Sequence, residues 1–329
     1  MIIVTGGAGF IGSALVKELN DSGERDIIIV DRMGDAHKWK NIRGLKYDSF
    51  VHADEFLKTN LLKSTALSAI YHMGACSSTT ETDVDYLMKN NVEYSKALFE
   101  AAAIYEKPIV YASSAATYGA GEQGYDDNQE KIASLRPLNP YGYSKQLFDE
   151  WVLRQKRLPT KWFGVKFFNV YGPNEYHKGS MSSVVYHAYN QINETKKMKL
   201  FKSYHPDFKD GEQKRDFVYV KDIVSAMIAL MNKADKNASG IYNLGSGMAR
   251  TFNDLVEATF QAMDKPTKIE YIEMPEHLKS QYQYYTQANM DKLKKALPDF
   301  TFSSLEEGVT DYVKNHLMQE NQYLETTRS

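Results

Sequence analysis

The sequence predicts an α/β fold in which a doubly wound parallel sheet carries a smaller, interleaved α/β domain. Two observations support this fold class. Short apolar segments alternate with longer helical patterns through the first half of the chain, and a glycine-rich turn directly follows the first apolar segment. Alternation of this kind is typical of a parallel sheet whose two faces are both covered by helices.

The predicted strands are short, apolar and rich in Ile, Val, Tyr or Phe, as is usual for strands buried in a sheet. They span residues 1–5, 26–30, 69–72, 108–112, 162–168, 217–220 and 241–244. Helical patterns span residues 10–21, 83–105, 141–157, 182–195 and 221–232. After residue 172 the regular alternation ends, which indicates that a second domain begins there.

The composition excludes several classes of function. Apolar residues make up 43% of the chain and charged residues 25%, which is ordinary for a globular protein. A formal net charge of −2 gives no electrostatic footprint for nucleic acid or an anionic membrane. With Cys76 as the one cysteine, no intrachain disulfide can form, and no segment resembles a signal peptide or a membrane span. We expect a cytoplasmic protein without a metal, because His72 and His177 are too isolated to form a metal site.

The glycine-rich turn, TGGAGFIG at residues 5–12, connects the first predicted strand to the first predicted helix. Gly6, Gly9 and Gly12 repeat at intervals of three residues. Glycine at these positions lets a pyrophosphate reach the backbone N–H groups at the positive end of a helix, and lets that helix pack closely on the strand. A plain tight turn is the alternative, but the position in the chain favours a Rossmann-type dinucleotide site.

We therefore expect two interleaved domains. Residues 1–170, together with about 214–245, form the dinucleotide-binding Rossmann domain. Residues 171–213 and 246–329 form the substrate-binding domain, and no repeat or low-complexity linker separates the two.

The second predicted strand is followed by residues that bear on the choice of dinucleotide. Asp31 lies where an acidic residue normally accepts hydrogen bonds from the adenosine ribose, which favours the unphosphorylated cofactor. Arg32 and Lys38 follow, and two cations beside that ribose could hold a 2′-phosphate, although they could also belong to a solvated loop. The pattern favours NADP and leaves NAD open.

A candidate catalytic set lies in the middle of the chain. Tyr141 and Lys145 are four residues apart on a predicted helix and so project from one face. An ammonium and a positive nicotinamide beside a phenol both favour its ionised form, which makes tyrosine a usable base. Ser114 follows the strand at 108–112, at the edge where such sheets bind ligands, and its hydroxyl could bind the oxygen that Tyr141 deprotonates. Ordinary turn chemistry is the alternative for Ser114.

The glycine-rich turn, Ser114, Tyr141 and Lys145 resemble the extended short-chain dehydrogenase/reductase superfamily, whose NAD-dependent epimerases and dehydratases act on nucleotide sugars. Within it, the chain resembles the epimerases that invert C6 of an ADP-linked heptose, a precursor of the lipopolysaccharide inner core. The resemblance covers essentially the whole chain, and segment 177–181 (HKGSM) is its most specific part. The other matching segments are 74–80, 113–119, 141–145, 168–173 and 214–220.

The resemblance implies a reaction and a set of site residues. The reaction passes through a transient 6-keto intermediate, uses tightly bound NADP and takes place in a homo-oligomer, by resemblance a pentamer. Tyr141 and Lys178 would be the two acid/base groups, supported by Ser114 and Lys145. The implied substrate contacts are Asn169, Ser180, His187, Phe201, Arg215 and Tyr282. The implied cofactor contacts are Gly6, Gly9, Phe10, Ile11, Gly12, Asp31, Arg32, Lys38, Met73, Gly74, Ala75, Cys76, Ser77, Asn90, Tyr141, Lys145, Val170 and Lys178.

The chain departs from the family pattern at three places. Arg32 replaces a frequent asparagine, Ala53 replaces a frequent lysine, and the stretch 201–213 is longer than expected. The second departure leaves one expected cofactor contact open, and the third leaves the substrate contacts of that stretch open.

The same scaffold also supports three alternative functions. A 4,6-dehydratase needs an acid and a base directly after the serine, where this chain has Ala115 and Ala116. A UDP-hexose 4-epimerase needs only the Ser114, Tyr141 and Lys145 set and is the main alternative. A non-catalytic dinucleotide-binding sensor is a third, although it has no need of an activated phenol.

Overall fold

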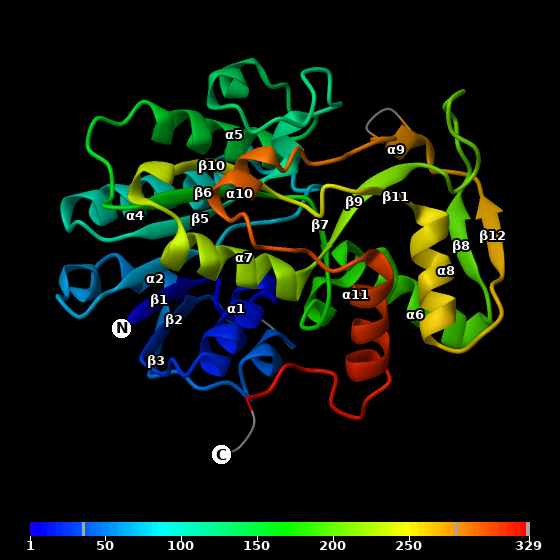
Figure 1. The fold of residues 1–329 in the computed structure, drawn as a ribbon, viewed down its shortest axis with the longest axis horizontal. Helices are drawn as coiled ribbons and strands as arrows, with labels where there is room; N and C mark the ends of the chain where they lie inside the picture. Colours follow the sequence, from blue (N-terminus) through cyan, green and yellow to red (C-terminus); the bar gives the residue numbers. More distant parts are fainter. Residues whose placement is uncertain (35–36, 280–281, 327–329) are drawn as a thin grey trace.

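The larger part of the molecule is a seven-stranded parallel sheet flanked by helices, seen in a computed structural model that describes residues 1–34, 37–279 and 282–326 (Figure 1). The sheet order is β10-β6-β5-β4-β1-β2-β3. The predicted doubly wound parallel sheet is thus confirmed. Its strands are β1 (Ile2–Thr5), β2 (Ile27–Asp31), β3 (Ser49–His52), β4 (Ala69–His72), β5 (Ile109–Ser114), β6 (Trp162–Phe167) and β10 (Gly240–Leu244).

Side-chain alternation along the strands divides the core into two layers. Ile2 and Val4 point to one face of the sheet, where α1 (Phe10–Asp21) and α7 (Val220–Lys233) pack. Ile3 points to the other face, which is covered by α4 (Tyr94–Ile104) and α5 (Pro140–Leu153). Both faces are therefore apolar, as the short, continuously apolar strand segments predicted.

The direction of the chain changes between two neighbouring strands in the middle of the sheet. From β1 the chain proceeds outward through β2 to β3, whereas β4, β5, β6 and β10 follow one another on the other side. The loops after β1 and β4 consequently leave in opposite directions. A crevice at the carboxyl ends of these strands is the usual ligand site of a doubly wound sheet.

The smaller unit lies to the right in Figure 1 and is assembled from segments that are far apart in the sequence. Its strands form a three-stranded sheet and a two-stranded sheet, in the orders β11-β9-β7 and β12-β8. They are β7 (Asn169–Tyr171), β8 (Met198–Phe201), β9 (Lys214–Tyr219), β11 (Ala249–Thr251) and β12 (Ile269–Ile272). The longer helices are α6 (Val184–Thr195), α8 (Phe252–Ala262) and α11 (Leu305–Tyr312). The proposed domain boundaries themselves stay a prediction.

Most of the predicted elements are present, with some differences in their bounds. The predicted helix 83–105 is divided into α3 (Val84–Leu87), a π-helical turn at Met88–Glu93, and α4. Four of the strands that the sequence did not predict, β3, β7, β11 and β12, expose part of their side chains, so they lack the apolar signal that marks the others. The remaining short helices are α2 (Ala53–Phe56), α9 (Glu276–Lys279) and α10 (Asp291–Ala296).

A buried ion pair joins α5 to the sheet. The Nζ atom of Lys166 lies 2.6 Å from a carboxylate oxygen of Asp149, and neither side chain is exposed to solvent. Ser113 Oγ donates to the same carboxylate at 2.6 Å, and Lys166 also donates to Thr117 Oγ1 at 2.8 Å. Loss of one partner of such a pair typically costs about 3–5 kcal/mol, because the other charge is left buried alone. The network therefore holds the end of β5, where Ser114 lies, in place.

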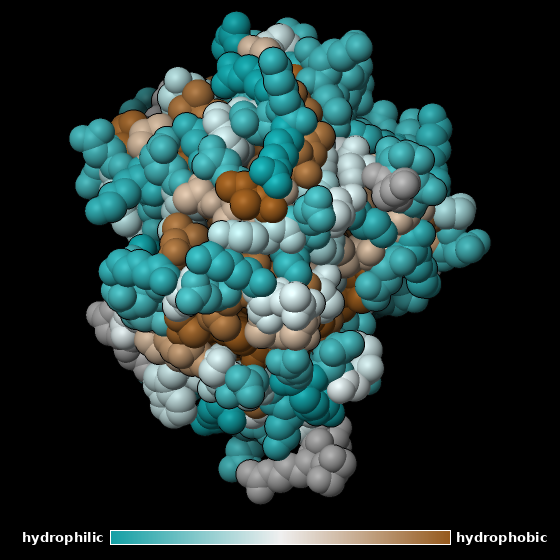
Figure 2. Space-filling view, turned by 90° about the vertical axis from the view of Figure 1, so that its left-hand side faces the viewer, coloured by the Kyte–Doolittle hydropathy of each residue, from teal (hydrophilic) through white to brown (hydrophobic). Residues whose placement is uncertain are grey.

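The surface opposite the smaller unit carries both hydrophobic and hydrophilic residues (Figure 2). Figure 2 shows hydrophobic residues on this face as small groups between hydrophilic ones. In the part of the chain that the structure describes, no helix combines the length and the apolar character that a membrane span requires.

Candidate functional site

The glycine-rich turn brings two backbone segments into direct contact. Gly6 has a φ angle of +68°, and a Cβ atom there would lie 2.6 Å from the backbone nitrogen of Gly74 in the loop after β4. A Cβ atom on Gly12 would lie 2.1 Å from the carbonyl oxygen of Gly6. Glycine is therefore required at both positions. No side chain caps the N-terminus of α1, so its backbone N–H groups are available to a phosphate.

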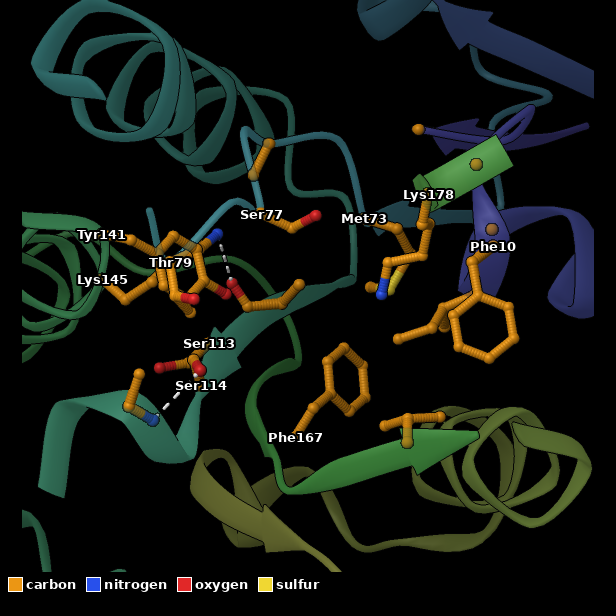
Figure 3. Close-up of a pocket in the computed structure, with 18 of the residues that line it drawn as sticks. Phe10, Met73, Ser77, Thr79, Ser113, Ser114, Tyr141, Lys145, Phe167 and Lys178 are labelled. Carbon is orange, nitrogen blue, oxygen red and sulfur yellow. Dashed lines mark hydrogen bonds between the residues drawn. The ribbon is translucent and has the colours of Figure 1, made fainter. Parts of the chain in front are cut away.

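A cavity of about 450 Å³ opens beside this contact, at the carboxyl ends of β1, β4 and β5. It collects most of the predicted site residues from stretches that are far apart in the chain. These are Gly6, Gly9, Phe10, Ile11, Gly12, Asp31, Lys38, Met73, Gly74, Ala75, Ser77, Ser114, Tyr141, Lys145, Asn169, Val170 and Lys178. Figure 3 shows Ser114, Tyr141 and Lys145 on one side of the cavity and Lys178 with Phe10 on the other.

Tyr141 and Lys145 lie in the first two turns of α5, which begins at Pro140 with Asn139 as its cap; the Asn139 side chain accepts a hydrogen bond from Gly142 N at 2.8 Å. Burial raises the pKa of the Tyr141 phenol, while a hydrogen bond with Ser114 lowers it. Burial lowers the pKa of Lys145 to about 8, and its Nζ atom donates to the carbonyl of Ala112 at 3.1 Å. We expected a lowered pKa for the Tyr141 phenol. In the structure its pKa is raised, because burial has a larger effect than the hydrogen bond with Ser114.

Lys178 reaches the cavity from a short 3₁₀ turn at Tyr176–Met181. Its ammonium lies 5.3 Å from the centre of the Phe10 ring. Burial lowers the pKa of Lys178, as expected for a usable base, but the charged neighbour is Glu175, which raises that pKa. Lys178 is therefore a partly buried ammonium with one compensating carboxylate.

Asn41 connects the segment that carries Lys178 to the glycine-rich turn. Its buried Nδ2 atom donates to the carbonyl of Ala8 at 3.0 Å and lies 3.2 Å from Nδ1 of His177. Burial lowers the pKa of His177 to about 4, so the ring is neutral at physiological pH and can accept this hydrogen bond. No sequence motif singles out Asn41, because its role depends on contacts between residues far apart in the chain.

The carboxyl end of β2 has its own arrangement of charged side chains. Asp31 accepts hydrogen bonds from Ala8 N at 2.9 Å and Arg32 N at 2.7 Å, and Lys38 Nζ lies 2.5 Å from it. Arg32 lines an adjacent pocket with Asn90 and forms an ion pair with Asp54 at 2.5 Å. Both cations that were considered for a 2′-phosphate are thus engaged by carboxylates of the protein.

Several predicted site residues do not line the main cavity. The backbone of Cys76 exchanges hydrogen bonds with the Asn91 side chain, and burial raises the pKa of its thiol. Arg215 is buried, with its guanidinium 5.3 Å from the centre of the Tyr282 ring. The others outside the cavity are Ser180, His187 and Phe201. His187 Nε2 lies 3.4 Å from the carbonyl of Ser180.

The structure also adds residues that sequence reasoning did not assign to the site. Besides His177, the cavity is lined by Thr79, Ala112, Ser113, Ala115, Ala116, Phe167, Phe168, Gln283 and Thr286. Most of them adjoin a predicted site residue, so proximity to Ser77, Ser114 or Asn169 was the available signal. Gln283 comes from the distant C-terminal part, where its side chain donates to the carbonyl of Gly119.

The residues at this edge of the sheet suit a dinucleotide. At the contact between Gly6 and Gly74 there is no room for a side chain. The uncapped N–H groups of α1 lie at the edge of the cavity, and Asp31 adds a carboxylate at the end of β2. Within residues 1–34, 37–279 and 282–326, no group of His, Cys, Asp and Glu side chains is arranged to hold a metal ion.

Comparison with known proteins gives consistent results. The model of the NAD dependent epimerase/dehydratase family matches residues 2–245. The chain is 52% identical to an ADP-L-glycero-D-manno-heptose-6-epimerase of Fusobacterium nucleatum, over 98% of this chain and 100% of that protein. It is 50% identical to the enzyme of that name in Nitratidesulfovibrio vulgaris, with the same coverage. Its fold is similar to the crystal structure of the Helicobacter pylori ADP-L-glycero-D-manno-heptose-6-epimerase, with a TM-score of 0.79, 30% identity and 95% of each chain covered.

The close approach of Gly6 and Gly74 predicts the effect of adding one methyl group. We expect Gly6→Ala to push the two loops apart and to abolish the retention of dinucleotide during purification. Gly23→Ala is the matched control, because Gly23 also has a positive φ angle, +95°, but has no atom within 4 Å of an added Cβ. The control should lose about 1–2 kcal/mol of stability and keep its dinucleotide. Mass spectrometry of the denatured proteins measures the retained dinucleotide, and full retention by Gly6→Ala would contradict the prediction.

Proposed function

Because the chain belongs to the NAD dependent epimerase/dehydratase family, we propose that it is an isomerase that converts ADP-D-glycero-manno-heptose into ADP-L-glycero-manno-heptose. The observation that carries this proposal is the position of Tyr141 and Lys178 on opposite sides of one cavity. Two proton-transfer groups in that arrangement suit the inversion of a carbon at which both faces must react.

A nicotinamide dinucleotide bound at the glycine-rich turn supplies the hydride acceptor and donor for such an inversion. One base takes the proton of the C6 hydroxyl as that carbon is oxidised to the ketone. The 6-keto intermediate then turns about its C5–C6 bond, so that the opposite face of the carbonyl is reduced. After this rotation the oxygen points in a new direction, and a second group must return the proton.

In this mechanism Tyr141 serves one epimer and Lys178 serves the other. Ser114 hydrogen-bonds Tyr141, which supports its assignment as a group that binds the same substrate oxygen. We assign to Lys145, one turn after Tyr141 on α5, the role of favouring the ionised phenol through its positive charge. Ala115 and Ala116 line the cavity without any acid or base, which favours epimerisation over dehydration.

Several finer assignments belong to the same proposal. We assign NADP as the cofactor, with Asp31, Arg32, Lys38 and Asn90 at its ribose end. Arg215 and Tyr282 are proposed to lie beside the ADP-sugar, together with Asn169, Ser180, His187 and Phe201. A cytoplasmic homo-oligomer, by resemblance a pentamer, that serves lipopolysaccharide inner-core synthesis also stays a prediction.

The main alternative is a UDP-hexose 4-epimerase. Epimerisation at a ring carbon requires the Ser114, Tyr141 and Lys145 set but gives no role to a second base. Lys178 in the cavity therefore favours the heptose reaction, as does the identity with the two named relatives. A non-catalytic dinucleotide-binding sensor would need neither Tyr141 nor Lys178.

Substrate turnover tests the proposed activity directly. Purified protein should epimerise ADP-D-glycero-manno-heptose and show little activity on UDP-glucose or UDP-galactose, as followed by chromatography or NMR of the products. Robust 4-epimerisation of a UDP-hexose would support the alternative, and an absence of turnover with every sugar nucleotide would favour the sensor.

The cofactor assignment has its own test. Arg32→Ala should weaken the binding of NADP by about 1–3 kcal/mol, because a charge-assisted contact to the 2′-phosphate is lost, and should leave the binding of NAD nearly unchanged. Titration with each dinucleotide measures both affinities. Equal weakening of NAD and NADP would show that Arg32 does not recognise the 2′-phosphate.

The two-base mechanism is tested by Tyr141→Phe and Lys178→Met. Each should lower the epimerisation rate on the order of 10²-fold or more while the protein still folds and retains its cofactor. Tyr143→Phe is a matched control, since Tyr143 lies exposed on the same helix. Epimerisation at the unchanged rate by Lys178→Met would mean that Tyr141 acts alone.

A substrate analogue with an aldehyde at C6 tests the two bases without requiring the intermediate to rotate. Two aldehyde molecules and one water can give one acid and one alcohol through oxidation and reduction at the same carbon, without inversion of the substrate. One base suffices for this dismutation, so each single variant should keep much of the activity. The double variant should lose it.

A further inference from the structure

The short helix α2, which follows β3, places a carboxylate beside the ribose end of the proposed dinucleotide site. Strands β2 and β3 are paired in register, with Asp31 opposite His52. The helix α2 begins directly after β3, with Asp54 in its first turn. Because the carboxyl ends of these parallel strands lie side by side, Asp54 lies next to Arg32, the residue that follows Asp31.

The Arg32 guanidinium donates hydrogen bonds to two side chains of the protein, those of Asp54 and Asn90. Its Nε atom donates to Asp54 Oδ1 at 3.0 Å, and its Nη2 atom donates to the same oxygen at 2.5 Å. Its Nη1 atom donates to Asn90 Oδ1 at 2.8 Å. The hydrogen bond from Arg32 lowers the pKa of the Asp54 carboxyl, so Asp54 is ionised at neutral pH. A phosphate that used this guanidinium would have to replace one of these partners.

The charges at this end of the site are close to balance. Lys38 is paired with Asp31, and Arg32 is paired with Asp54. Lys89 lines a second pocket together with Arg32 and Asp54, while Ala53, which also lines it, contributes no charge. A 2′-phosphate, with about two negative charges at pH 7, would therefore meet two carboxylates as well as the cations that attract it.

We propose that Asp54 is a specificity-determining residue, which competes with the 2′-phosphate of NADP for Arg32 and thereby reduces the preference for NADP over NAD. This inference rests on the proposed function, in which Arg32 recognises that phosphate. It adds that the site tolerates both dinucleotides, because its principal phosphate ligand is already occupied when NAD binds.

The exposure of the pair makes competition feasible. The side chains of Arg32 and Asp54 are 44% and 54% exposed. An ion pair at that exposure is weak and screened by salt, so a phosphate dianion can displace it. The displaced carboxylate nevertheless stays attached to α2, where its charge repels the phosphate.

The test compares two variants that remove one negative charge each. Asp54→Asn keeps the size of the side chain and a hydrogen-bond acceptor for Arg32. Glu55→Gln is the matched control, because Glu55 is the next residue, is exposed, and pairs with Lys58 instead of Arg32. Each purified protein is incubated with equimolar NAD and NADP, and the dinucleotides that it retains are quantified by mass spectrometry. Titrations with NAD and with NADP then give the separate affinities.

We expect Asp54→Asn to raise the ratio of retained NADP to NAD by about three- to tenfold, through tighter NADP binding with NAD binding unchanged. The effect should shrink as salt is added, and Glu55→Gln should leave the ratio unchanged. An unchanged ratio in Asp54→Asn, or a ratio that falls because Asp54 orients Arg32 for the phosphate, would overturn the inference.

Failure of this inference is distinguishable from failure of the cofactor assignment. If Arg32→Ala weakens NADP selectively while Asp54→Asn has no effect, Arg32 recognises the phosphate and Asp54 does not compete. If Arg32→Ala weakens both dinucleotides equally, the assignment of Arg32 is wrong, and the inference falls with it. Turnover of the heptose substrate is decided by neither result.

Discussion

The site depends on one close approach, that of the backbone at Gly6 to the backbone at Gly74. These residues follow β1 and β4, the adjacent strands at which the chain reverses its direction across the sheet. Any side chain at Gly6 would separate the two loops, and any side chain at Gly12 would push α1 away from Gly6. The free N–H groups of α1 and the adjoining edge of the cavity are therefore positioned by contacts between residues without side chains.

A second constraint lies beneath the catalytic side of the cavity. Asp149 is two helical turns after Tyr141 and one turn after Lys145 on α5, and it binds both Lys166 on β6 and Ser113 on β5. The helix that carries the proposed base and the strand that ends at Ser114 are thus joined through one carboxylate. Because this carboxylate and Lys166 are fully buried, water does not compete for these hydrogen bonds.

The sequence alone was sufficient for the parts of the molecule that depend on local patterns. The parallel sheet follows from buried strands with a continuous apolar signal, and Gly6, Tyr141 and Lys145 follow from fixed spacings around those strands. The partly exposed strands β3 and β12 have no such signal. Asn41, Asp54 and Asp149 were missed because their roles arise from partners that are far away in the chain or on another element.

The two proposed bases hold the same total number of protons in two different charge states. The neutral state, with a Tyr141 phenol and a Lys178 amine, holds the same number of protons as the charged state, with a phenolate and an ammonium. In the proposed mechanism, each epimerisation has the net effect of moving one proton from one of these groups to the other. Burial favours the neutral state by raising the pKa of Tyr141 and lowering that of Lys178. The hydrogen bond from Ser114 lowers the pKa of Tyr141, and the charge of Glu175 raises the pKa of Lys178, so both act against the effect of burial. These two neighbours therefore keep the charged state accessible, as a reaction that runs in both directions requires.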